Sequence, residues 1–224
     1  MNAGLSQEPK KIWIEVLVLY AIAIAIIGLF KLLSFVPFIN DNLWGIAGIV
    51  FLFLPVEYLY RKKADLVAFG ITWKHLGRGL LWAALLMAIT FPPYIWGYKW
   101  WFGREVFHFA LPSTFWQEVV GNLFLVALPE EAFYRGFMQT RLDGVFKGRV
   151  NVLGAKVGWA LVITSALFAV GHLVEFRADK LGTFLPGLVF GWLRAKTGSI
   201  GGAVVFHAGC NIWAQVLRYG YFGV

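Results

Sequence analysis

The sequence is poor in the charged residues that keep most proteins soluble. Of its 224 residues, 14% are charged and 59% are hydrophobic, and the mean hydropathy is +0.69. A soluble globular domain has about 25% charged and about 45 to 50% apolar residues. A water-soluble fold is therefore excluded, and we expect an integral protein of the lipid bilayer. Cysteine is also scarce, because Cys210 is the only one, which excludes an intrachain disulfide.

Other features are missing as well. The first ten residues lack the charge, apolar stretch and small-residue pattern of a removable signal peptide, so we expect the first apolar segment to remain as a helix. No internal repeat or low-complexity tract interrupts the chain. We therefore expect one membrane domain, residues 1–224, in which residues 113–217 form the catalytic helices. The net charge of +8 does not indicate a nucleic-acid partner, because Lys and Arg lie at the ends of apolar segments, as membrane anchors do.

Apolar segments recur along the chain, and a bilayer crossing needs roughly 20 helical residues. They predict an all-α fold, a multi-pass transmembrane helical bundle with about seven membrane helices plus a surface amphipathic segment between the second and third. The predicted spans are residues 12–33, 43–60, 80–98, 113–142, 157–174, 181–193 and 200–217. The sixth is short and rich in glycine. With the N-terminus inside, 13 Lys and Arg lie on the inner side and five on the outer side, which predicts a cytoplasmic N-terminus and an outer C-terminus.

Three polar motifs interrupt the apolar background of the second half. Their members stand four residues apart, and therefore on one face of a helix. The motifs are Glu130-Glu131-x-x-x-Arg135, Phe168-x-x-x-His172 and His207-x-x-x-Asn211. An ionised group inside a bilayer is costly, roughly 2.5 to 3.5 kcal/mol on insertion scales, and usually has a function. Glu131 and Arg135 can neutralise each other as a structural ion pair, which leaves Glu130 without a local partner. Pro129 is expected to disturb the helix beside it.

Helix geometry allows the three motifs to meet. Glu130 and His172 each lie 21 residues from a turn predicted near Asn151, so antiparallel helices would place them at similar depth. A second turn near Gly198 brings the third motif to that level. A carboxylate and an imidazole can activate water by general acid-base catalysis. A second imidazole and an amide can stabilise an oxyanion. The pattern thus suggests a peptide hydrolase that needs no side-chain nucleophile and no cofactor.

The three motifs, in this order on membrane helices, resemble those of the CPBP family of intramembrane glutamic proteases. This family includes CAAX prenyl endopeptidases, bacterial Abi proteins and bacterial C-terminal sorting proteases. The resemblance covers about residues 129–211. It implies that Glu130 and His172 activate the catalytic water, that His207 and Asn211 stabilise the oxyanion, and that Glu131, Arg135 and Phe168 support the site.

The resemblance implies a membrane-anchored or lipid-associated protein as the substrate. Either a prenylated C-terminus enters from the cytoplasm, or a bacterial protein with a C-terminal sorting signal is cut near the outer face. The basic turn near Asn151 should be cytoplasmic, which places Glu130 and His172 in the middle to outer half of the bilayer. This depth favours bacterial C-terminal sorting or maturation, in the cytoplasmic membrane of a bacterium.

Other functions are compatible with parts of the pattern. Two glutamates and two histidines could bind zinc, although the H-E-x-x-H motif is absent. Cys210 could act as a nucleophile, although its helical position directs it to a different face from His207 and Asn211. A non-enzymatic immunity or scaffold protein, or a transporter, could also carry buried charges. Substitution of Glu130 or His172 distinguishes a protease from a non-enzymatic protein, because the protease would lose turnover while keeping its fold, whereas a scaffold would keep its function.

Overall fold

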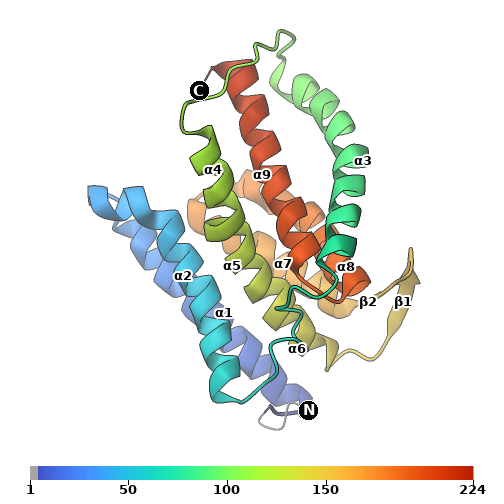
Figure 1. Ribbon diagram of the computed structural model, residues 1–224. Coiled ribbons are helices and arrows are strands. Elements are labelled where there is room, and N and C mark those ends of the chain that lie inside the picture. Colours follow the sequence, from blue (N-terminus) through green and yellow to red (C-terminus); the bar gives the residue numbers. More distant parts are fainter. Residues whose placement is uncertain (1–4, 224) are drawn as a thin grey trace.

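The computed structural model describes residues 5–223, so the expectation about the first ten residues lies partly outside the described residues. Each predicted span coincides with a helical segment (Figure 1). These segments are α1 (Pro9–Leu32), α2 (Pro37–Arg61), α3 (Leu76–Phe102), a composite helix from Phe115 to Asp143, α7 (Trp159–Gly171), α8 (Phe184–Thr197) and α9 (Gly201–Phe222). The all-α class is confirmed. By length and composition, α1, α2 and α3 can cross a membrane.

The remaining helices are shorter or more polar than a simple membrane span. α8 has 14 residues, and α9 carries the third motif. Two 3₁₀ turns, η3 (His172–Glu175) and η4 (Ala178–Thr183), link α7 to α8. The amphipathic segment before α3 is an irregular loop that buries Phe69 and exposes Lys62 and Lys63.

The composite helix changes its winding along its length. It consists of α4 (Phe115–Gly121), the π-helical η1 (Asn122–Ala127), α5 (Leu128–Glu131), the π-helical η2 (Ala132–Gln139) and α6 (Thr140–Asp143). Pro129 does not end the helix, but it offers no N–H to the carbonyl of Leu125 one turn earlier. That carbonyl lies against Gly48 of α2, where any side chain would clash with it. The glycine thus allows α2 to pack directly on the composite helix.

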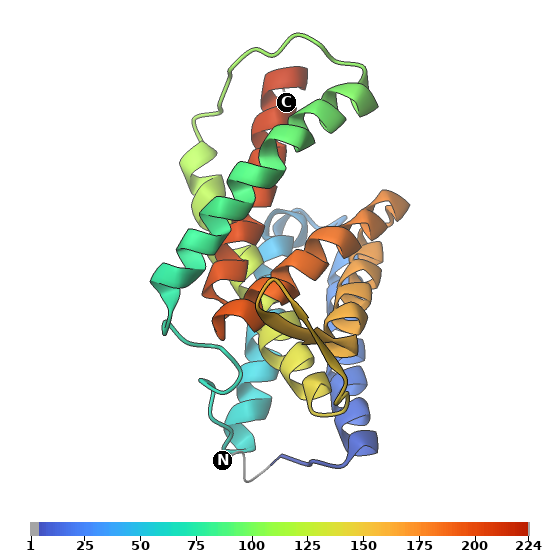
Figure 2. The same cartoon turned by 90° about the vertical axis from the view of Figure 1, so that its right-hand side faces the viewer.

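Pairs of neighbouring helices build the bundle around the composite helix. α1 packs along α2, α7 along α8, and α3 along α9, while the start of α1 and the end of α9 lie at opposite ends of the molecule (Figures 1 and 2). Gly79 of α3 and Gly202 of α9 face each other so closely that a Cβ on either would meet the backbone of the other. Such small residues allow the close helix approach that stabilises membrane bundles.

A short β-hairpin replaces the simple turn predicted near Asn151. Strand β1 (Arg149–Val152) pairs antiparallel with β2 (Ala155–Gly158), through a two-residue turn in which Leu153 and Gly154 both have positive φ. The predicted span at residues 157–174 therefore begins in a strand. α8 holds the hairpin: Trp192 Nε1 donates to the carbonyl of Val152 at 2.9 Å.

Candidate active site

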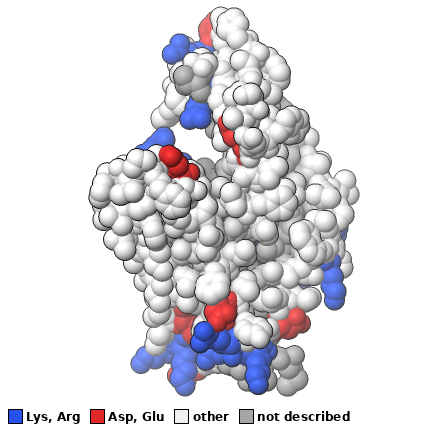
Figure 3. Space-filling model, turned by 60° about the vertical axis from the view of Figure 1, so that its left-hand side comes forward, with Lys and Arg blue, Asp and Glu red and all other residues white. Residues whose placement is uncertain are grey.

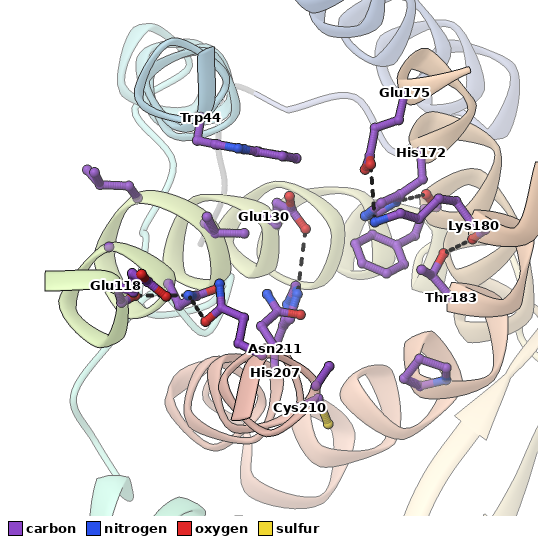
Figure 4. A pocket seen from close by; sticks show the side chains of 18 of the residues that line it. Trp44, Glu118, Glu130, His172, Glu175, Lys180, Thr183, His207, Cys210 and Asn211 are labelled. Carbon is purple, nitrogen blue, oxygen red and sulfur yellow. Dashed lines mark hydrogen bonds and ion pairs between the residues drawn. The ribbon is translucent and has the colours of Figure 1, made fainter. Parts of the chain in front are cut away.

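A cavity of about 710 Å³ opens between the composite helix, α9 and the segment from Phe168 to Thr183. Glu130, His172, His207 and Asn211 all line it. Figure 4 shows the Glu130 carboxylate directed toward His207, with His172 on another side of the same space. The structure thus brings together the four residues that the sequence singled out as catalytic.

The π-helical stretch η1 keeps residues that are four positions apart on the cavity side of the composite helix. Glu118, Asn122, Val126 and Glu130 are spaced by four residues, and all line it. In a regular α-helix each such step overshoots one turn by about 40°, so the residues would drift around the axis. A π-helix has more residues per turn and counteracts this drift.

Behind the cavity, Glu131 and Arg135 form a fully buried ion pair. Arg135 Nη1 lies 3.1 Å from Glu131 Oε1, and the exposed fraction of both side chains is 0%. A second guanidinium nitrogen donates to the carbonyl of Gly187 at 3.1 Å. The guanidinium also lies 4.3 Å from the centre of the Phe168 ring. The pair therefore holds the composite helix against α7 and α8.

The glycines of α8 make these contacts possible. Gln139 donates to the carbonyl of Gly191 at 3.0 Å, as Arg135 does to that of Gly187 one turn earlier. A Cβ at Gly191 would lie 2.7 Å from Gln139 Oε1, and one at Gly187 would lie 3.1 Å from Arg135 Nη2. The glycines that make the sixth span a poor match to a membrane helix have a role in the fold. Because they lack side chains, Arg135 and Gln139 can reach the backbone carbonyls of α8.

His207 lies between the two glutamates. Its Nδ1 is 2.9 Å from Glu131 Oε1, and its Nε2 is 3.8 Å from Glu130 Oε2. A carboxylate paired with Arg135 accepts hydrogen bonds, so Nδ1 carries the proton that it donates to Glu131. The ring stacks on Phe190, with centres 4.5 Å apart and planes at 13°. These contacts fix the direction in which Nε2 faces the cavity.

His172 is likewise held through Nδ1. Its Nδ1 lies 2.8 Å from the carbonyl oxygen of Phe168, which can only accept, so Nδ1 is the donor. In the neutral form of the ring, Nε2 carries the lone pair. Phe168 also packs edge-on against the imidazole, with centres 4.5 Å apart. The second motif therefore fixes both the tautomer and the orientation of His172.

The Glu130 carboxylate lies within ion-pair distance of His207, but its Oε2 makes no hydrogen bond within the described residues. The exposed fraction of Glu130 is 8%. The sequence suggested His172 as its partner, but the ion pair that the structure contains is with His207, and no direct bond between Glu130 and His172 occurs in the described part of the chain. The cavity separates them, which leaves room for a bridging molecule.

Other side chains of the cavity were not identified from the sequence. Asn122 Nδ2 donates to Gln215 Oε1 at 3.2 Å, joining the composite helix to α9. Both could have been found, because Asn122 precedes Glu130 by eight residues and Gln215 follows Asn211 by four. No motif spacing in the sequence points to Phe190 or Trp44. Cys210 packs against the core as expected, but it also lines the cavity, which its helical position did not suggest.

No three His, Cys, Asp or Glu side chains within the described residues are arranged to hold a metal ion. Glu131, which zinc would need as a ligand, is already committed to Arg135 and His207.

A comparison with protein families identifies the segment that contains the site. Residues 112–213 match the family model described as "Rce1-like: Type II CAAX prenyl endopeptidase Rce1-like". No curated protein and no solved structure matches the chain. The matched segment spans the composite helix, α7, α8 and the first half of α9, and thus all three motifs.

Proposed function

The chain belongs to the CPBP/CAAX protease family through residues 112–213, and we propose that it is an intramembrane endopeptidase whose water is activated by Glu130 and His172. Membership of the family makes it a membrane protease in general terms. The observation that supports a glutamate-dependent mechanism is that Glu130 lines a cavity shared with His172 and His207, and that no hydrogen bond within the described residues engages its Oε2. In this proposal the chain forms one membrane domain, and residues 113–217 form its catalytic helices.

In this mechanism a water molecule lies between Glu130 and His172. One group accepts a proton as the water oxygen attacks the scissile carbonyl carbon, which forms a tetrahedral oxyanion. The same proton then passes to the leaving nitrogen. The C–N bond breaks, and the products are a carboxylic acid and an amine. No covalent enzyme intermediate is required.

The oxyanion would be stabilised by His207 and Asn211, one helical turn apart on α9. His207 and Asn211 both line the cavity. In this scheme His207 donates through Nε2 once that nitrogen carries a proton, and Asn211 donates through its amide. Donors fixed before the reaction stabilise developing charge effectively in a site that excludes water. Glu131 and Arg135 act indirectly in this scheme, because they hold Nδ1 of His207 and Phe168 in place.

The position of the cavity supports a substrate that is cut near the outer face. Figure 3 shows a dense cluster of Lys and Arg at one end of the molecule, and a hollow in the surface toward the other end, where further Lys and Arg also lie. Basic residues mark the cytoplasmic side of membrane proteins. With a cytoplasmic N-terminus, the cavity would lie in the outer half of a bacterial cytoplasmic membrane. We therefore propose C-terminal sorting or maturation of a membrane-associated bacterial protein.

A prenyl-protein endopeptidase is the second candidate, because the matching family model carries that description. Its substrate would approach from the cytoplasm. Cleavage of a farnesylated peptide, but not of the same peptide without its lipid, would favour this function over sorting or maturation.

The proposed protease is tested by comparing the C-termini of membrane proteins in cells that produce wild-type, Glu130→Gln or Glu57→Gln protein. Glu57 is a control carboxylate, paired with Arg61 near the end of α2. We expect shortened C-termini with the wild type and with Glu57→Gln, and their loss with Glu130→Gln. Identical C-termini in all three cell lines would overturn the proposal.

A further inference from the structure

His172 stands at the point where α7 changes its winding. α7 ends at Gly171, and the 3₁₀ turn η3 begins at His172. The backbone N–H groups of this cap bond to the carbonyls of Ala169 and Val170. A regular α-helix would instead use the carbonyl of Phe168 for the N–H of His172. Here the Phe168 carbonyl accepts a hydrogen bond from the His172 ring, so the winding and the orientation of the ring are connected.

α1 contacts α7 just before this point. The Tyr20 hydroxyl donates to the carbonyl of Leu167 at 2.9 Å, and Leu167 directly precedes Phe168. In an α-helix the Leu167 carbonyl is the acceptor for the N–H of Gly171, the last residue of α7. A side chain that joins this ladder of backbone bonds bends the helix locally. The hydroxyl therefore acts on the turn in which α7 gives way to η3.

Gly171 allows two tyrosines to approach the same turn. A Cβ at Gly171 would lie 2.6 Å from the Tyr134 hydroxyl oxygen and 3.5 Å from that of Tyr20. The two tyrosine rings meet edge-on, with centres 6.4 Å apart. Tyr134 also packs edge-on against Phe168, at 5.1 Å between centres. The last turn of α7 thus contacts one tyrosine from α1 and one from the composite helix.

α1 is itself fixed at two places along its length. Glu15 accepts a hydrogen bond from Arg141 Nε at 3.1 Å, and the exposed fraction of the Arg141 side chain is 6%. Farther along α1, a Cβ at Gly28 would lie 3.5 Å from Val174 of η3. Tyr20 lies between these contacts in the helix. Its hydroxyl is therefore held in place beside α7.

We propose that Tyr20 is a positioning residue for the reaction, because its bond to Leu167 holds α7 in the winding that fixes the His172 ring. Tyr20 does not line the cavity, so it acts on the reaction only through His172. This inference rests on the proposed function. It gives a part in the active site to α1, which lies outside the residues 112–213 that match the family model.

The test begins with Tyr20→Phe, which removes the hydroxyl and keeps the ring. Full-length protein in phospholipid nanodiscs is assayed with a quenched fluorescent peptide that contains a site found among the shortened C-termini. We expect kcat to fall about tenfold or more with little change in KM, because a displacement of about 1 Å in a catalytic geometry can cost about 100-fold.

Tyr58→Phe is the matched control. Tyr58 of α2 packs edge-on against Phe137, at 5.7 Å between ring centres, and it does not line the cavity. This variant also loses one tyrosine hydroxyl from the bundle. It should keep the kcat and KM of the wild type.

The protonation pattern of His172 gives a readout that a general loss of packing would not produce. Solid-state NMR of protein with isotope-labelled histidine, in lipid bilayers at alkaline pH, shows which ring nitrogen carries the proton, and His172→Gln identifies the signal. We expect the proton on Nδ1 in the wild type and in Tyr58→Phe. In Tyr20→Phe we expect a second population with the proton on Nε2, because Nδ1 then lacks a fixed acceptor.

The possible results are distinct. An unchanged kcat in Tyr20→Phe, or a lower kcat with the His172 signal of the wild type, would overturn the inference and leave the proposed protease intact. An equal loss of kcat in Tyr58→Phe would overturn it as well. If no C-terminus in the cells depends on Glu130, the proposed function itself fails, and Tyr20 then has no role in catalysis even if the histidine signal changes.

Discussion

Removal of the charge of Arg135 should strongly destabilise the protein. Arg135→Met keeps a long side chain but leaves Glu131 buried, with His207 as its remaining partner. Breaking a buried ion pair by deleting one member costs about 3 to 5 kcal/mol, because the other charge loses its compensation. The carbonyl of Gly187 also loses its donor. For a chain of this size, 1 kcal/mol corresponds to about 2 to 4 °C, so Tm should fall by about 6 to 20 °C.

The double variant Glu131→Gln/Arg135→Met distinguishes a charge effect from a packing effect. Both charges are then absent, and we expect it to be more stable than Arg135→Met alone, by about 2 kcal/mol. Arg61→Met is the control, because the Arg61–Glu57 pair is exposed and should contribute less than about 1 kcal/mol.

Thermal unfolding in detergent, followed by tryptophan fluorescence, provides the measurement. If Arg135→Met lowers Tm no more than Arg61→Met does, the buried pair does not stabilise the bundle. If the two substitutions are simply additive, their charges are not coupled. Either result would refute the account of Glu131 and Arg135 given above.

Three further predictions concern the reaction. Asn211→Ala should lower kcat by about 10²- to 10³-fold with little change in KM, as loss of an oxyanion donor does. Steady-state kinetics on a cleaved peptide measures both constants, and a rise in KM with unchanged kcat would contradict this role. Cys210→Ala should retain full activity in the same assay. A loss of activity as large as that of Glu130→Gln would instead indicate that Cys210 is the nucleophile. Activity should persist after prolonged dialysis against a strong chelator, and its recovery only on addition of zinc would instead require a metal-dependent mechanism.

The local parts of the site could be predicted because they depend on helix periodicity alone. A step of four residues on a helix pairs Glu131 with Arg135 and packs Phe168 on His172, and both contacts occur. The approximate depth of Glu130 and His172 followed from chain length on either side of a turn. The depth in the bilayer stays a prediction, but Glu130 and His172 do line one cavity although a β-hairpin replaces the predicted turn.

The partners across helices could not be predicted, because they depend on how far each helix is rotated about its axis. His207 contacts Glu131 as well as Glu130, and its ring stacks on Phe190 of α8. The π-helical stretches alter the rotation along the composite helix, and no pattern of residue types indicated them.

The sequence by itself determined the membrane environment, the helical class and the spacing of the three motifs, because hydropathy and helical period are properties of neighbouring residues. The tertiary structure alone decided that His207 donates through Nδ1 to Glu131 and faces Glu130 with Nε2. Those assignments depend on contacts between segments that are far apart in the chain. Such contacts are fixed only when the helices pack.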